Sequence, residues 1–152
     1  MTILVGLVEG AVNESVPSID TCIHDIDNTA EDFETAIADF RKETLQDVEN
    51  GIVALGDAVS SVAADLHDCE IAIKDVEKLD KMAKTFQNPW SFAYHVGKDI
   101  LVDGTDIYKE ISGGITAYDA ADYHTFGFDI GKALALVLVG EDGHEEVDFI
   151  QQ

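Results

Sequence analysis

The chain has 152 residues, with 31 acidic against 9 basic side chains, and its formal net charge is −22. This length indicates one domain, and 46% apolar residues exclude a chain that is disordered for lack of a core. Because so acidic a surface repels nucleic-acid phosphates and anionic lipids, nucleic-acid binding is also excluded. The longest uncharged apolar stretch, residues 133–139, is far shorter than the roughly 20 residues of a membrane-spanning helix, so no membrane span is expected.

Helical periodicity dominates the first half of the chain. Apolar residues recur in steps of three and four from Ile19 to Phe40 and again from Leu45 to Leu66. The step of five between Phe40 and Leu45 breaks this phase, which places a tight turn at about residues 41–44. The sequence therefore predicts a long antiparallel helical hairpin over about residues 18–67.

The hairpin makes a prediction about the two cysteines. Cys22 and Cys69 are nearly equidistant from the predicted turn, so they should be neighbours on the two helices. A disulfide is favoured over two buried free thiols; it would stabilise the fold by roughly 4 kcal/mol in the chain-entropy model and would indicate an oxidising compartment. A turn at Asn50-Gly51 instead would separate the two sulfurs by more than about 10 Å.

Further helices are expected after Cys69. One should continue to about Phe86, and another should run from Pro89 to Asp103, with Gly104 as a left-handed cap. An alternative is one long helix across Gly104, at a cost of about 1 kcal/mol.

The last two helices should follow. Thr105 is predicted to cap a helix that carries Ile111 on its apolar face, and the final helix should begin near Asp122 and end at Gly140. Residues 133–139 also read as a buried strand, but no partner strand is apparent.

These elements predict an all-α fold, an up-and-down helical bundle of five to seven helices built on the long hairpin. A sheet of three or more strands would contradict it. Residues 1–140 should form a single domain, and residues 141–152 an acidic C-terminal tail. The expected core consists of Ile26, Phe33, Ile37, Phe40, Leu55, Val59, Val62, Val76, Ile111, Ile130 and Leu134.

Glycines recur at helical spacing, in the pairs Gly6 with Gly10 and Gly127 with Gly131 and in the doublet Gly113-Gly114. Small residues four apart let two helix backbones approach closely. Tight packing within one bundle is favoured over a dimerisation motif.

No catalytic chemistry is apparent in the sequence, so the protein is expected not to be an enzyme and to have no cofactor. The only Glu-x-x-His pair is Glu141 and His144, and no specific metal site is expected. An EF-hand beginning at Asp25 is disfavoured because Ala30 stands where that loop requires glycine. Diffuse calcium binding is expected at Asp103, Asp106 and residues 141–146. Asn13 begins an Asn-Glu-Ser glycosylation triplet.

Two hypotheses for function follow. The first is a secreted structural or interaction module that forms a homo-oligomer or filament or binds a matrix, through apolar residues near both ends: Ile3, Leu4, Leu7, Val147, Phe149 and Ile150. The alternative is a carrier that binds a small apolar ligand within the bundle, in a pocket formed by Phe86, Trp90, Tyr94, Tyr118, Tyr123 and Phe126.

The two cysteines, the stretch 106–111 and the glycine-containing stretch 126–135 resemble a small two-cysteine helical module of secreted proteins from ciliates and other protists. The resemblance covers residues from about 19 to 140. It implies secretion and a disulfide, and no activity. The apolar N-terminal stretch 3–12 has no basic residue before it, so the chain is expected to be either cytosolic or already trimmed. The disulfide and the resemblance together favour a secreted, extracellular or lumenal location.

Overall fold

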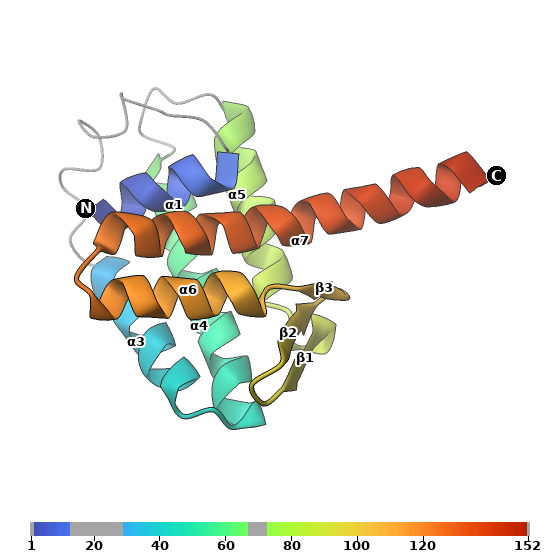
Figure 1. Cartoon of the computed structure of the whole chain (residues 1–152). Helices are drawn as coiled ribbons and strands as arrows, with labels where there is room; N and C mark the ends of the chain where they lie inside the picture. The colour runs from blue at the N-terminus through green and yellow to red at the C-terminus, as the bar shows by residue number, and fades with distance from the viewer. Residues whose placement is uncertain (1, 13–28, 67–72, 152) are drawn as a thin grey trace.

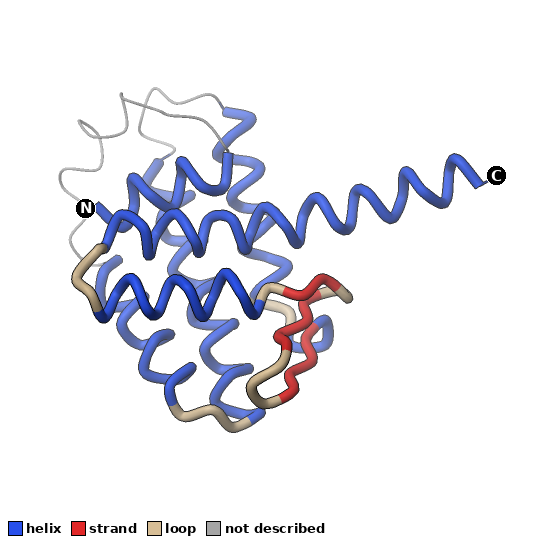
Figure 2. The backbone as a smooth tube through the Cα atoms, in the orientation of Figure 1, coloured by secondary structure: helices blue, strands red, loops and turns tan. Residues whose placement is uncertain are grey.

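The computed structural model describes residues 2–12, 29–66 and 73–151, and this part of the chain is mainly helical (Figures 1 and 2). Its six α-helices are α1 (Thr2–Val12), α3 (Thr29–Arg41), α4 (Leu45–Leu66), α5 (Ile73–Phe86), α6 (Tyr108–Asp119) and α7 (Tyr123–Gln151). A short 3-10 turn, η2 (Pro89–Ser91), precedes three strands, β1 (Phe92–His95), β2 (Asp99–Val102) and β3 (Thr105–Asp106). The mainly helical fold class is confirmed.

Helices α3 and α4 pack against each other across the predicted turn. Residues 42–44 connect them, and the Thr44 hydroxyl accepts a hydrogen bond from the backbone N–H of Asp47 (3.1 Å), which caps the first turn of α4. The predicted core is confirmed: its members are buried, apart from Ile26, which lies outside the described residues. The upstream part of the predicted hairpin, residues 18–28, also lies outside them.

The helix predicted from Pro89 to Asp103 is wrong, because this stretch forms a small antiparallel sheet of order β1-β2-β3. Val102 pairs with Thr105 across Asp103 and Gly104, whose φ angles of 51° and 81° are both left-handed, as a two-residue hairpin turn requires. Gly104 therefore turns a hairpin and does not cap a helix. A purely all-α bundle is contradicted, since three strands interrupt the succession of helices.

The structure tests the remaining predictions at the start of α6 and at both ends of α7. The N-cap residue of α6 is Ile107, not Thr105, and the Oδ1 of Asp106 just before it accepts a hydrogen bond from the N–H of Tyr108 (2.9 Å). Helix α7 begins beside Asp122 as predicted, but it continues through Gly140 to Gln151, so the predicted end is wrong. Residues 133–139 are helical, which excludes the strand alternative. The distal part of α7 projects beyond the other elements (Figure 1).

The helices form two packed sets. Helix α7 lies between α1 and α6, while α4 lies between α3 and α5, and the sheet closes one end beside the start of α6 (Figure 1). The rings of Phe33 and Phe126 meet edge to face between the two sets, with centroids 6.0 Å apart. This arrangement places the α3–α4 turn and the sheet on either side of one face of α6.

The contact between α1 and α7 is made backbone against backbone. A Cβ added at Gly127 would lie 2.0 Å from the carbonyl oxygen of Ile3, and one added at Gly10 would lie 2.2 Å from that of Phe128. Residue numbers rise together along the two helices, with Gly6 beside His124 and Gly10 beside Phe128, so α1 and α7 run parallel. The glycine pairs therefore serve packing within one chain, the interpretation that the spacing favoured.

Candidate functional site

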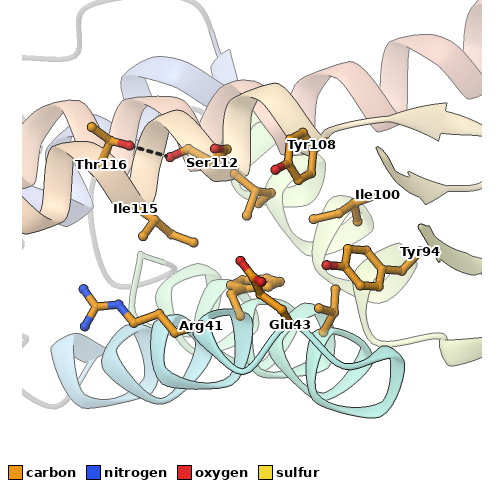
Figure 3. Close-up of a pocket in the computed structure, with 11 residues that line it drawn as sticks. Arg41, Glu43, Tyr94, Ile100, Tyr108, Ser112, Ile115 and Thr116 are labelled. Atoms are coloured by element: carbon orange, nitrogen blue, oxygen red, sulfur yellow. Dashed lines mark hydrogen bonds between the residues drawn. The ribbon is translucent and has the colours of Figure 1, made fainter. Parts of the chain in front are cut away.

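An open pocket of about 180 Å³ lies between the α3–α4 turn, the sheet and α6 (Figure 3). Its floor is apolar and belongs to the core, with Phe40, Val48, Ile100, Ile111 and Ile115. Its mouth carries the polar groups of Arg41, Glu43, Tyr94, Tyr108, Ser112 and Thr116. A site of this composition suits a ligand with an apolar body and a polar or charged end.

The floor depends on a glycine of α4. A Cβ at Gly51 would approach the ring of Phe40 to 2.9 Å, so only glycine lets that ring lie flat against α4 without a shift. Phe40 is 6% exposed and ends the apolar stripe of α3. The last turn of α3 and the start of α4 thereby form one wall of the pocket.

Helix α6 forms the opposite wall with one regular face. Tyr108, Ser112 and Thr116 recur every four residues, so they share a side of the helix beside the apolar stripe of Ile111 and Ile115. The hydroxyl of Thr116 donates to the carbonyl of Ser112 within the helix (3.1 Å). This spacing is visible in the sequence and is the signal by which these pocket residues can be found.

Glu43 stands in the connecting turn with a positive φ of 54°. Its backbone N–H donates to the carbonyl of Phe40 (3.3 Å), and its side chain rises toward the space between the two walls (Figure 3). Burial, and next the negative charge of Glu43, raise the pKa of the Tyr94 hydroxyl. The carboxylate and this phenol are therefore electrostatic neighbours at the mouth of the pocket.

Side-chain contacts between α3 and α6 lie next to the pocket, beyond Arg41. Arg41 forms an ion pair with Asp119, and the Tyr118 hydroxyl donates to Glu34 (3.3 Å). Burial first, and then the Glu34 carboxylate, raise the pKa of Tyr118. The one guanidinium at the pocket is thus already paired with a carboxylate of the same chain.

The structure does not bring the six predicted pocket aromatics together. Of the six, Tyr94 alone lines the pocket, while Trp90 is 94% exposed on the 3-10 turn and Phe86 is buried at the end of α5. Tyr118, Tyr123 and Phe126 form a separate edge-to-face cluster with centroids 5.4 Å apart. Sequence reasoning missed Glu43, Tyr108 and Ser112, because the predicted helix over the strands gave them no common cavity.

The residues of the predicted interaction surface fall into two groups. Ile3 and Leu7 are buried where α1 packs on α7 of the same chain, so they are not available to a neighbouring subunit. A hydrogen bond between His124 Nε2 and Glu9 Oε2 (2.9 Å) adds to that contact. The side chains of Leu4, Val147, Phe149 and Ile150 are outside the described part of the structure, although the backbone is helical at all four positions.

Three further predicted sites fall on residues that the structure does not describe. These are Asn13 and the two cysteines, Cys22 and Cys69, so the disulfide stays a prediction.

Of the acidic residues proposed for diffuse calcium binding, Asp103 lies in the β2–β3 turn. Asp106 uses its carboxylate for the N–H groups of Ile100 (3.3 Å) and Tyr108. Within the described ranges, no group of three or more His, Cys, Asp or Glu residues is placed to hold a metal ion. The side chains of residues 141–146 are not described.

A family model described as SctB-like, secreted protein B-like, matches residues 1–139. The match supports the expected likeness to secreted proteins, but it does not support the narrower likeness to a ciliate or protist module. No curated protein and no solved structure shows significant similarity to the chain. Among the helices that the structure describes, none has the length and apolar character needed to cross a bilayer.

Proposed function

Because the chain belongs to the secreted protein B-like family, we propose that it is a secreted, non-enzymatic binding module whose ligand occupies the pocket between α6 and the α3–α4 turn. The observation that carries this proposal is the pocket itself, with an apolar floor continuous with the core and hydroxyl and charged groups at its mouth. The family description supports secretion and leaves the ligand open.

The size of the pocket limits what enters it. Its volume of about 180 Å³ is below the roughly 300–1,000 Å³ of sites that enclose drug-sized ligands. An apolar cavity of roughly 150 Å³ accepts benzene. We therefore infer that a single ring or a short branched chain enters, and that the rest of the ligand stays at the mouth.

A blocked pocket tests this function. Ser112 is exposed at the mouth, so in Ser112→Trp the indole should cover the floor without disturbing the core. The matched control is Ser61→Trp, at an exposed position of α4 outside the pocket. With 2-phenylethanol as probe, the methyl resonances of Ile111 and Ile115 should shift in the wild type and in the control, and not in Ser112→Trp. A wild type in which the probe leaves these two methyl resonances unchanged would refute the pocket as the binding site.

Self-association through the C-terminus is a second candidate, and one observation favours it. Helix α7 continues to Gln151 and projects beyond the body, and its end carries the apolar residues Val147, Phe149 and Ile150 in the sequence (Figure 1). A chain of charge −22 associates only where apolar burial, salt or divalent cations offset the repulsion. The N-terminal residues give this candidate no support, since α1 packs on its own chain.

Light scattering of the full chain at low and high salt, with and without calcium, decides this second candidate. An assembly should appear when repulsion is screened, and Phe149→Ser should weaken it while Gln151→Ser leaves it unchanged. A mass of 16.5 kDa under all four conditions would eliminate self-association.

A further inference from the structure

The backbone at Glu43 is unusual for its residue type. Within the described part of the chain, three residues other than glycine have positive φ: Glu43, Asp103 and Ala121. Such a conformation costs on the order of 1–3 kcal/mol, and strained residues cluster at functional sites. A glycine at position 43 would make the same turn without that cost. The strain is therefore the cost of having the side chain of Glu43 at this position.

The carboxylate of Glu43 has no partner in the part of the chain that the structure describes. Among the described residues it forms no hydrogen bond and no ion pair, whereas the neighbouring Arg41 is paired with Asp119. Figure 3 shows the Arg41 guanidinium away from the Glu43 carboxylate, while the Tyr94 hydroxyl points toward the Glu43 side. The mouth of the pocket therefore presents a carboxylate that no described residue pairs, with the hydroxyl of Tyr94 on one side of it (Figure 3).

From this arrangement we propose that the pocket binds a small organic monocation, an ammonium group on an aromatic or branched apolar body. The apolar body would rest on Ile100, Ile111 and Ile115, and the ammonium would lie between the carboxylate of Glu43 and the rings of Tyr94 and Tyr108. This inference rests on the binding function proposed above and names the class of its ligand.

The chemistry of the site matches that class in three respects. An ammonium donates charge-assisted hydrogen bonds to a carboxylate, which are shorter and stronger than neutral ones. The faces of tyrosine rings attract cations, by about 0.5–1 kcal/mol where the site is exposed. The net charge of −22 raises the local concentration of cations and repels anions of the same shape.

Three probes that share one ring and one chain length separate charge from shape. Calorimetric titration of the full chain should show that 2-phenylethylamine binds at least tenfold more tightly than 2-phenylethanol, and that 3-phenylpropanoate does not bind. The affinity for the amine should fall as salt is raised, because screening weakens the attraction.

The variant that tests the assignment is Glu43→Gln, which keeps the shape and removes the charge. This variant should lower the affinity for 2-phenylethylamine about tenfold and leave the affinity for 2-phenylethanol unchanged. The matched control, Glu77→Gln, makes the same charge change at an exposed position of α5 and should affect neither probe. Thermal denaturation of both variants shows whether each is folded.

The outcomes separate the two proposals. Equal binding of amine and alcohol, with no effect of Glu43→Gln, would overturn the monocation and keep the pocket as a binding site. If neither amine nor alcohol binds, both proposals fail. If Glu43→Gln and Glu77→Gln weaken the amine equally, the attraction belongs to the whole acidic surface, and the assignment to Glu43 is wrong.

Discussion

Helix α7 meets glycines from two helices, and the two contacts differ. On the α1 side, a Cβ added at any of Gly6, Gly10, Gly127 or Gly131 would lie 2.0–2.2 Å from a backbone oxygen. On the α6 side, the Cβ of an alanine at Gly113 would meet only the flexible Asp129 carboxylate, at 3.3 Å. The first contact has no room for a side chain. The second tolerates one, and the far face of α6 borders the open pocket. Glycine spacing alone therefore does not show how closely two helices approach.

The largest change in stability should come from adding a methyl group to the contact between α1 and α7. Adding the same group to the contact between α6 and α7 gives the comparison. Gly127→Ala forces α1 away from α7, because a backbone oxygen cannot rotate aside, and we expect a loss of about 2–3 kcal/mol in unfolding free energy. Gly113→Ala on α6 should instead be neutral or stabilise by up to about 1 kcal/mol through helix propensity. Urea denaturation gives both values, and hydrogen exchange shows whether α1 loses protection. Equal changes in unfolding free energy for the two variants would show that the two contacts do not differ in the room they leave for a side chain.

The pocket side of α6 faces a strained turn, and relieving that strain should have a smaller effect. Glu43→Gly should raise the unfolding free energy by about 0.5–1 kcal/mol, since glycine adopts a positive φ without a Cβ clash. Glu43→Gln retains the strain and should leave stability unchanged. Thermal denaturation of the two variants measures the difference. A destabilised Glu43→Gly would mean that the carboxylate supports the fold.

The smallest effect concerns Asp129, which lies against Gly113. Burial, opposed by Lys132 and reinforced by Glu110 and Asp122, raises its pKa above the ordinary value. The folded state therefore disfavours the ionised carboxyl, and stability should fall as pH rises from the unfolded pKa through the folded one.

Asp129→Asn removes this penalty. It should stabilise the protein by no more than about 0.5 kcal/mol at pH 7, with no gain near pH 3, where the carboxyl is protonated in both states. Denaturation at the two pH values checks it. A gain of the same size at pH 3 would show that the charge is not the cause.

Local patterns in the sequence sufficed for most of the helices. The stripes from Phe33 to Phe40 and from Val48 to Val62, and the break of phase at residues 41–44, depend only on neighbours three or four positions away. The same holds for the start of α7 beside Asp122. Residues 92–102 were misread because short apolar runs fit both periods, although Asp103-Gly104 between apolar segments is a strong hairpin signal.

Which segments meet was decided only by the tertiary structure. The apolar residues of α1 were as compatible with a neighbouring subunit as with α7, and only the register of the two glycine pairs docks them within the chain. The pocket likewise joins Phe40, Tyr94 and Ile115 from three elements far apart in sequence. Helical periodicity is set by contacts between near neighbours, whereas a cavity depends on how the faces of distant elements fit together, and that fit is not encoded at any one spacing.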